Sequence, residues 1–200
     1  MGRLVVSMFS TLDGVMQGPG APGEDTEGGF PFSGWQAPFA GHDSGTVIVD
    51  SILGQDALLL GRKTYDIWVR HWPQATDVIG ARFNAIPKFV ASRTLADPEW
   101  AGTTVLTDVA TEVAALKTTF DEIRLWGSGE LLAALLGHDL VDQIDLFTFP
   151  VVLGTGKRVF REGTTPAAFE IVGEPRGFTG GVVLARYRRA GDPEFGDVTP

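Results

Sequence analysis

The chain has no cysteine among its 200 residues. This absence excludes disulfide bonds, iron–sulfur clusters, thiolate zinc sites and a cysteine nucleophile. Basic residues are also scarce, with 16 Lys and Arg against 25 Asp and Glu and a formal net charge of −9. Such an acidic chain is not expected to bind nucleic acid or anionic membranes over its whole surface, because both require cations that neutralise phosphates.

Long apolar runs are absent as well. No run approaches the roughly 20 residues of a membrane helix, and the run from Leu4 to Phe9 is too short for a signal-peptide core. The hydrophobic content of 44% and the charged content of 20% are typical of a folded globular chain. We therefore expect one soluble, cytoplasmic domain over residues 1–189, followed by a loose tail over residues 190–200.

Several catalytic patterns are missing. His42, His71 and His138 lie far apart and form no metal-binding spacing, so we expect no metal site. The run Gly154-Thr155-Gly156-Lys157-Arg158 departs from a nucleotide-binding P-loop, because Val151 stands where the first glycine is needed and Arg158 where Ser or Thr is needed. The chain also lacks the G-x-S-x-G turn of many serine hydrolases.

Apolar and turn residues alternate in a way that predicts eight strands and four helices. The predicted strands are residues 3–10, 57–61, 87–91, 103–106, 123–126, 144–153, 168–172 and 178–187, and the predicted helices are 47–53, 62–68, 109–120 and 130–136. We expect a hairpin turn at residues 174–177. The order indicates an α/β fold with a mostly parallel sheet, helices on both faces and antiparallel strands at the C-terminal end.

One long segment is rich in glycine and proline. Between Gln17 and Gly45, 8 of 29 residues are Gly and 4 are Pro, and none is Lys or Arg. Long loops inside compact domains are usually functional lids or disordered. We expect a lid here, which would bring Trp35 and Phe39 over a substrate.

Three predicted strand ends suit a phosphate. Gly61-Arg62-Lys63-Thr64 joins a strand to a helix and carries two cations, and helix N-termini attract phosphates. Gly127-Ser128-Gly129-Glu130-Leu131 matches half of a dinucleotide fingerprint, with Leu132 in place of its third glycine. Ser92-Arg93 suits a phosphate monoester such as the 2′-phosphate of NADPH. The alternatives are solvated first-turn cations at Arg62 and Lys63 and an ordinary turn at Ser92.

These strand ends belong to a longer set of stretches that follow one another along the chain. The set comprises Ser10-Thr11-Leu12-Asp13-Gly14, Asp56 to Tyr65, Pro87 to Leu95, Gly127 to Leu131 and Pro150 to Lys157. Together they resemble the reductase domain of the bifunctional riboflavin-biosynthesis deaminase-reductase and the stand-alone dihydrofolate-reductase-like proteins related to it. The resemblance runs from Arg3 to about Arg188. It implies a dihydrofolate-reductase-like fold, NADPH as hydride donor and a homodimer.

The resemblance also assigns residues to the cofactor. It places Gly61 to Thr64 at the cofactor phosphates, Ser92 and Arg93 at the 2′-phosphate, and Gly127 to Leu131 at the pyrophosphate. It further implies that Phe9, Ser10 and Met16 line the nicotinamide side.

A true dihydrofolate reductase has a carboxylate in the helix after the first loop, and the candidates here are Asp43 and Asp50. Neither lies in a clear match to that motif. Asp43 could equally cap the helix, and Asp50 could face solvent. Asp13 is better explained as part of an Asp-Gly turn.

We expect an NADPH-dependent reductase that transfers a hydride to a small heterocycle, pterin-like or pyrimidine-like, or to a carbonyl compound. One alternative is a non-catalytic protein that binds NADPH or another small ligand, and another is a flavin-dependent oxidoreductase. With this domain filling the 200 residues we expect no deaminase domain beside it, and we therefore do not assign the riboflavin intermediate as the substrate. Self-association would use the strand from Ile144 to Leu153.

Overall fold

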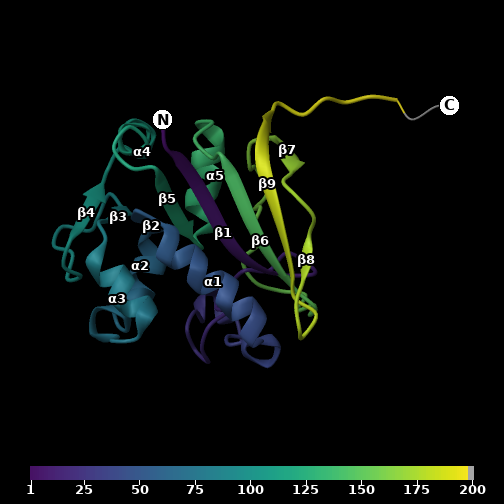
Figure 1. Cartoon of the computed structure of the whole chain (residues 1–200), viewed down its shortest axis with the longest axis horizontal. Helices are drawn as coiled ribbons and strands as arrows, with labels where there is room; N and C mark the ends of the chain where they lie inside the picture. Colours follow the sequence, from purple (N-terminus) through teal and green to yellow (C-terminus); the bar gives the residue numbers. More distant parts are fainter. Residues whose placement is uncertain (198–200) are drawn as a thin grey trace.

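The computed structural model describes residues 1–197, apart from the side chain of His42. Its nine strands form one sheet, in which eight follow the order β4-β3-β2-β5-β1-β6-β9-β7 and β8 pairs with β9 (Figure 1). The strands are β1 (Arg3–Thr11), β2 (Ala57–Gly61), β3 (Lys88–Ala91), β4 (Thr103–Leu106), β5 (Glu122–Trp126), β6 (Gln143–Phe149), β7 (Ala168–Ile171), β8 (Arg176–Gly177) and β9 (Val183–Gly191).

Strands β4, β3, β2, β5, β1 and β6 pair in parallel, whereas β9 runs antiparallel to β6, β7 and β8. The helices are α1 (His42–Gly54), α2 (Arg62–Trp68), α3 (Val78–Ala85), α4 (Val109–Leu116) and α5 (Gly129–Gly137), with short 3₁₀ segments η1 (Glu27–Gly29), η2 (Ala37–Phe39) and η3 (Trp72–Gln74). The predicted α/β class, with a mostly parallel sheet and antiparallel C-terminal strands, is confirmed.

Helices cover both faces of the sheet, and the central strands are apolar on both sides. In β2, Leu58 and Leu60 pack into a cluster with residues of α1, α2 and α3, whereas Leu59 packs into a cluster with residues of α4 and α5. All three leucines are fully buried. Burial on both faces explains why β2 reads as a continuous apolar run rather than an alternating one.

Three sequence predictions about elements were wrong. The structure has a fifth helix, α3, which begins after Asp77, whose carboxylate accepts hydrogen bonds from two backbone N–H groups. The strand predicted over 178–187 begins only at Val183, because residues 178–182 form a turn that a Phe178 N–H to Val182 carbonyl hydrogen bond of 2.8 Å closes. Gly180 and Gly181 adopt φ of +85° and +80° in that turn. The turn predicted at 174–177 is therefore misplaced, and part of it is β8.

The glycine-rich segment between β1 and α1 is packed against the body. It has no α-helix before His42, but Phe30 and Trp35 are buried in a cluster with Phe147 and Phe149 of β6. The indole N–H of Trp35 donates to the carbonyl oxygen of Gln17 at 2.8 Å. Aromatic anchors thus hold a segment whose composition disfavours regular structure.

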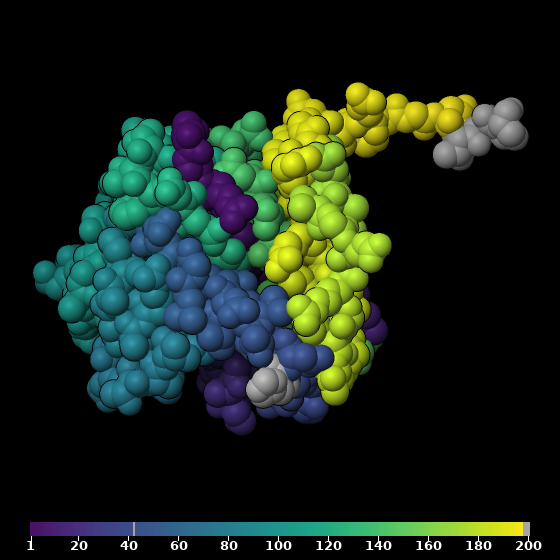
Figure 2. Space-filling view, in the orientation of Figure 1, coloured from purple at the N-terminus to yellow at the C-terminus, as the bar shows by residue number. Residues whose placement is uncertain are grey.

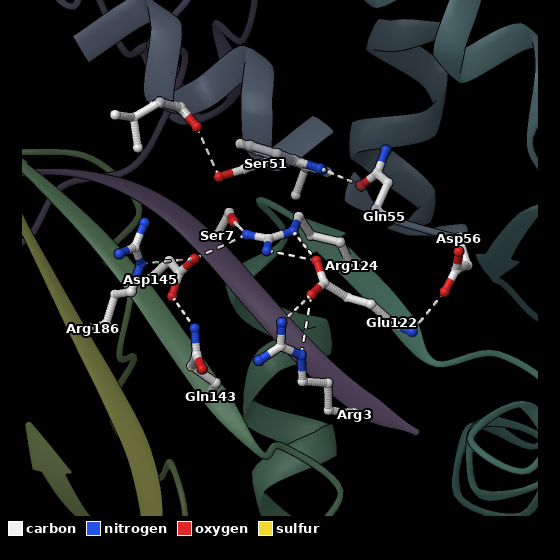
Figure 3. A network of polar contacts seen from close by, with 12 residues as sticks. Arg3, Ser7, Ser51, Gln55, Asp56, Glu122, Arg124, Gln143, Asp145 and Arg186 are labelled. Carbon is white, nitrogen blue, oxygen red and sulfur yellow. Dashed lines mark hydrogen bonds and ion pairs between the residues drawn. The ribbon is translucent and has the colours of Figure 1, made fainter. Parts of the chain in front are cut away.

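A buried ionic network lies on the sheet face that α1 partly covers (Figure 3). The guanidinium of Arg124 on β5 contacts Glu122 Oε1 at 2.6 Å, Asp145 Oδ2 on β6 at 3.0 Å and Ser7 Oγ on β1 at 2.7 Å. Arg3 extends the network at Glu122, at 2.6 Å. The network ties β5, β1 and β6 together beneath the site described below.

The C-terminal segment after β9 extends away from the body (Figure 2). Strand β9 continues to Gly191 and so includes the first two residues of the predicted tail. Residues 198–200 of that tail lie outside the described residues. Within residues 1–197, none of the helices has the length and apolar character needed to span a membrane.

Candidate functional site

A cavity of about 1120 Å³ opens near the carboxyl ends of β1, β2, β3 and β5. Its walls come from those strands, from α2 and the start of α5, from residues 16–27 of the glycine-rich segment and from residues 157–161 after β6. Open α/β sheets bind ligands outside the carboxyl ends of their strands. The cavity is therefore the candidate functional site.

Eleven residues that the sequence assigned to a cofactor line this cavity. They are Phe9, Met16, Gly61, Arg62, Lys63, Thr64, Gly127, Ser128, Gly129, Glu130 and Leu131. The segments lie far apart in the sequence, and the parallel pairing of β2 with β5 and of β5 with β1 brings them together.

Five other predicted residues do not line the cavity. The hydroxyl of buried Ser10 donates to the carbonyl oxygen of Thr11 at 2.9 Å, and Arg93 is exposed. Ser92 lies beside the cavity, where its oxygen accepts from the N–H of Leu95 at 3.1 Å. The two carboxylates, Asp43 and Asp50, are both on α1, which contributes no wall.

The Asp43 carboxylate is engaged elsewhere. Its Oδ2 accepts from the backbone N–H of Thr179 at 2.9 Å and from the Thr179 hydroxyl at 3.0 Å. These hydrogen bonds, led by the one from the Thr179 N–H, lower the pKa of Asp43. Asp50 is exposed on α1. Both residues have the surroundings of structural or solvent-facing groups.

Gly61 and Ser128 touch across the cavity floor. A Cβ built on Gly61 would lie 1.7 Å from the Ser128 Oγ, so a larger residue at position 61 requires the Ser128 side chain to move. Ser128 has φ +72° and ψ +73°, in the left-handed region that side chains other than glycine seldom adopt. Such strain persists where the surroundings over-determine it, commonly at ligand sites. The close approach of β2 to the β5–α5 turn therefore fixes the backbone of this wall.

The start of α5 faces the cavity in the same close-packed manner. A Cβ on Gly129 would lie 3.0 Å from the carbonyl oxygen of Arg158 and 3.1 Å from the sulfur of Met16. A glycine there lets the 157–159 segment and Met16 approach the first turn of α5. The first N–H groups of a nine-residue helix have no helical partners, and they suit an anion.

Arg62 is oriented by contacts on both sides. Its Nε donates to both carboxylate oxygens of Asp66, at 2.8 and 2.9 Å. On its other side, Nη1 lies 3.5 Å from Ser92 Oγ and 3.4 Å from Thr94 Oγ1. Contacts of this length are weak hydrogen bonds, so a phosphate oxygen could compete with the two hydroxyls for the Arg62 guanidinium.

The glycine-rich segment is fastened over the cavity by ion pairs. Lys157 Nζ lies 2.6 Å from a carboxylate oxygen of Asp25 and 2.6 Å from one of Glu27. Lys63 of α2 also pairs with Glu27. The amide of Gln17 donates to Asp25 at 3.0 Å, so the glycine-rich segment, α2 and the loop after β6 meet at this point.

These contacts shift the pKa values of the groups involved. Burial alone would raise the pKa of Asp25, but hydrogen bonds from Lys157, the Glu27 N–H and Gln17 outweigh it and lower the pKa. Hydrogen bonds from Lys157 and Lys63 lower the pKa of Glu27. Burial opposes the charge of Lys157, yet the two carboxylates raise its pKa. At neutral pH the Asp25 and Glu27 carboxylates are therefore deprotonated and the Lys157 ammonium is protonated, so neither carboxylate carries a proton to donate.

The apolar wall consists of Phe9 and Trp126. Their ring centroids lie 6.1 Å apart. The Trp126 indole N–H donates to Gln55 Oε1 at 2.9 Å, and the Arg124 guanidinium lies 5.8 Å from the ring. The hydrogen bond to Gln55 and the contact with Arg124, a member of the ionic network, thus orient the Trp126 ring.

Cations gather in the cavity although the chain is acidic. Six of the 16 Lys and Arg residues line it, against four of the 25 Asp and Glu residues. The six cations are Arg62, Lys63, Arg70, Lys157, Arg158 and Arg161. An excess of cations in a water-restricted cavity attracts anions.

Sequence reasoning missed part of this lining. Trp68, Arg70, His71 and Trp72 contribute from the end of α2 onward, and Arg158 and Arg161 from the loop after β6. A signal was present in Gly154-Thr155-Gly156-Lys157-Arg158, which fails as a P-loop but still carries two cations on a glycine-rich loop. Within residues 1–197, no cluster of three or more His, Asp or Glu side chains is placed to hold a metal ion.

Comparisons with known proteins agree on one family. The chain is 26% identical over 191 residues to the uncharacterized protein YyaP of Bacillus subtilis (strain 168), which covers 92% of this chain and 94% of that protein. A crystal structure from Shewanella sp. PV-4, named for riboflavin biosynthesis, superimposes with a TM-score of 0.71 at 21% identity over 94% of this chain and 99% of that one.

Two further structures share the fold. A pyrimidine reductase-like protein from Corynebacterium diphtheriae has a TM-score of 0.64 at 10% identity, over 96% of this chain and 93% of that one. A deaminase/uracil reductase from Thermotoga maritima has a TM-score of 0.59 at 17% identity, over 94% of this chain and 57% of that longer chain. The family model of the RibD C-terminal domain matches residues 3–173. The chain therefore belongs to the RibD C-terminal domain family.

Proposed function

We propose that the chain is an NADPH-dependent reductase of a small heterocyclic or carbonyl compound. The observation that carries the proposal is the cavity itself, about 1120 Å³ in volume, which six cationic side chains of an acidic protein line. Ligand cavities commonly measure about 300–1000 Å³. The volume therefore allows a cofactor and a small second molecule together.

The residues present fit a phosphate-bearing dinucleotide. Gly61, Ser128 and Gly129 form a close-packed backbone wall at the start of α5, where a pyrophosphate would accept hydrogen bonds from backbone N–H groups. Arg62, with the hydroxyls of Ser92 and Thr94, would hold a 2′-phosphate. Arg93 directly follows Ser92 and would add a second cation at the edge of this phosphate site. Phe9, Met16 and Trp126 would receive the nicotinamide.

NADPH, when bound, supplies the hydride. The chain would then hold and orient the cofactor. The phosphate contacts would set its position, and the apolar rings of Phe9 and Trp126, tilted 43° to each other, would contact its reacting ring. Residues 16–27, fastened by Asp25 and Lys157, would keep water from the reacting atoms.

The names of the structural neighbours support a pyrimidine-like substrate. The Corynebacterium protein is called pyrimidine reductase-like, and the Thermotoga protein is a 5-amino-6-(5-phosphoribosylamino)uracil reductase. A cavity with aromatic side chains at Trp68, Trp72 and Trp126 suits a flat ring. We therefore place pyrimidines ahead of pterins as substrates to test.

The proposal is tested by calorimetric titration with NADPH and NADH, followed by NADPH oxidation at 340 nm with candidate substrates. We expect binding of NADPH in preference to NADH, and turnover with at least one of a pyrimidine intermediate, dihydrofolate, a quinone or a simple carbonyl compound. Absence of NADPH binding would overturn the proposal. Visible flavin absorbance in the purified protein would instead favour a flavin enzyme.

A second candidate function is non-catalytic binding of NADPH. It is favoured by one observation, that neither Asp43 nor Asp50 lines the cavity. The cavity carboxylates of Asp25 and Glu27 are held ionised by lysines. NADPH binding without turnover on any substrate class would support this second candidate.

Self-association is a separate part of the proposal. Strand β6 lies inside the sheet between β1 and β9, so its edges are not available for pairing with a second copy. A homodimer would need another surface. Light scattering that reports a mass near 43 kDa, twice the 21.4 kDa of one chain, would support it.

A further inference from the structure

Glu27 is shared by two lysines from different walls of the cavity. Its carboxylate pairs with Lys63 at the start of α2 and lies 2.6 Å from the ammonium of Lys157, which follows β6. The side chains of Lys63 and Glu27 are 53% and 51% exposed, so this pair lies at the cavity mouth. One carboxylate therefore connects the glycine-rich segment to two parts of the protein.

The backbone at Glu27 is held by contacts that do not use its carboxylate. Its carbonyl oxygen accepts from Gln17 Nε2 at 3.0 Å, and its N–H donates to Asp25 Oδ1 at 3.0 Å. Asp25 is itself paired with Lys157. A rotation of the Glu27 side chain can therefore uncover Lys63 while the backbone of the segment stays in place.

Exchange of the Lys63 partner would leave no charge unpaired. When Lys63 turns to another anion, Glu27 retains Lys157. The Lys63–Glu27 pair is exposed, and exposed ion pairs contribute little. A phosphate group offers several strongly accepting oxygens and up to two negative charges, so it competes well with one carboxylate. A neutral ligand has no charge that could replace the Glu27 carboxylate beside Lys63.

Glu27 also reduces the repulsion between two adjacent cations at the start of α2. Arg62 and Lys63 are adjacent cations, and the first turn of α2 contains no acidic residue. Asp66 neutralises Arg62 from the next turn, and Glu27 neutralises Lys63 from outside the helix. Both cations of this turn are thus covered by carboxylates of the protein itself.

We propose that Glu27 is a specificity-determining residue, whose carboxylate covers Lys63 in the ligand-free protein and yields it only to a phosphate. The inference rests on the proposed function, because the phosphate is taken to be one of those of NADPH. The glycine-rich segment would then not only cover the cavity but also favour ligands that carry a phosphate. Ligands without a phosphate must bind against an intact Lys63–Glu27 pair.

The test is a double-mutant cycle on the full chain, with NADPH affinity measured by titration calorimetry. We expect Glu27→Gln to bind NADPH about three- to tenfold more tightly than the wild type, because the competitor for Lys63 has lost its charge. In a Lys63→Gln background, Glu27→Gln should change the affinity less than twofold. Glu174→Gln, which removes one exposed carboxylate away from the cavity lining, is the control for net charge.

The outcomes separate this inference from the proposed function. If wild type binds NADPH and Glu27→Gln binds it equally or more weakly, Glu27 is only an anchor and the inference is overturned. A gain that persists in the Lys63→Gln background would also overturn it, since Glu27 would then act through another group. If the wild type does not bind NADPH, both the inference and the proposed function fail. Far-ultraviolet circular dichroism confirms that each variant is folded.

Discussion

The ammonium of Lys157 lies 2.6 Å from the carboxylate of Asp25 and joins the glycine-rich segment to the loop after β6. The Asp25 side chain is only 15% exposed, and its other oxygen accepts from Gln17 and from the Glu27 N–H. The same lysine presents its backbone N–H to Gln17 Oε1 at 3.1 Å. The pair is thus the centre of the contacts that hold residues 17–27 over the cavity.

Replacing Asp25 with Asn should loosen this segment without unfolding the protein. The amide keeps the shape but loses the charge that Lys157 needs, and we expect a loss of about 1 kcal/mol. Chymotrypsin is the suitable probe, since the segment contains no Lys or Arg and Phe32 is 44% exposed. Cleavage after Phe32 should be several-fold faster in Asp25→Asn than in the wild type or in the exposed-site control Asp97→Asn.

The contribution of this pair should depend on pH in a defined direction. Because the pKa of Asp25 is lowered in the folded protein, its contribution is complete above the unfolded value of roughly 3.9 and is lost as pH falls through the folded pKa. Because the pKa of Lys157 is raised, its contribution is lost only above roughly 10.4. The wild type and Asp25→Asn should therefore differ by a constant amount between about pH 5 and 9. Urea denaturation at a series of pH values measures that difference.

The strand-and-helix alternation was predictable because it depends on local patterns. The apolar run at residues 57–61 and the cap Asp108, whose carboxylate accepts from the Thr111 N–H, both specify their elements by nearest neighbours. Helix α3 was missed because it includes Gly80 and Asn84, which have low helix propensity. The turn at residues 178–182 was missed because two glycines there are as compatible with a strand end as with a turn.

The cavity was predicted less completely because tertiary contacts assemble it. Gly61 and Gly127, which the motifs predicted to contact a cofactor, do lie in the cavity wall. Nothing local connects Glu27 with Lys63, 36 residues apart, or Asp25 with Lys157, 132 residues apart. The partners of Asp43 are likewise distant, at Thr179. The partners of charged residues in the glycine-rich segment are therefore seen only in the folded structure, not in the sequence.

Arg62 should contribute more to NADPH preference than Arg93. Arg62 lines the cavity and faces the hydroxyls of Ser92 and Thr94, whereas Arg93 is exposed outside the lining. We expect Arg62→Gln to reduce the ratio of NADPH to NADH affinity about tenfold or more, since a charge-assisted contact contributes about 1.5–3 kcal/mol. Arg93→Gln should reduce the ratio by less.

Calorimetry with both nucleotides measures this ratio for each variant. Equal losses of NADPH and NADH affinity in Arg62→Gln would show that Arg62 contacts the pyrophosphate or no phosphate. If Arg93→Gln reduced the ratio more than Arg62→Gln, Arg93 rather than Arg62 would be the residue that contacts the 2′-phosphate. Circular dichroism distinguishes either result from misfolding.

Gly61→Ala should be destabilising because of Ser128 alone. The added Cβ would lie 1.7 Å from Ser128 Oγ, and overpacking of this kind typically costs about 1–3 kcal/mol. Ser128→Gly should be neutral or stabilising, since it releases a residue at φ +72°. The double variant Gly61→Ala/Ser128→Gly should recover most of the loss. Thermal unfolding of the four proteins tests this, and failure of the second substitution to rescue the first would place the conflict elsewhere.

The buried ionic network around Arg124 should contribute far more to the free energy of unfolding than an exposed ion pair on the same sheet. Asp145 on β6 is 2% exposed and holds Arg124 at 3.0 Å, whereas Glu170 and Arg188, on β7 and β9, are 54% and 64% exposed and lie 2.5 Å apart. Distance alone would rank the exposed pair higher. Burial reverses that order, because an unpaired charge inside the protein cannot be solvated.

Asp145→Asn should therefore lower the free energy of unfolding by about 2–4 kcal/mol, whereas Glu170→Gln should lower it by less than about 1 kcal/mol. Arg124 keeps Glu122 at 2.6 Å in the first variant, so the loss should stay below that of a fully orphaned guanidinium. Because the Arg124 guanidinium lies 5.8 Å from the Trp126 ring, Asp145→Asn should also weaken NADPH binding, and Glu170→Gln should not. Urea denaturation and calorimetry measure the two effects. Equal stability losses in both variants would mean that the network contributes no more than a solvated pair.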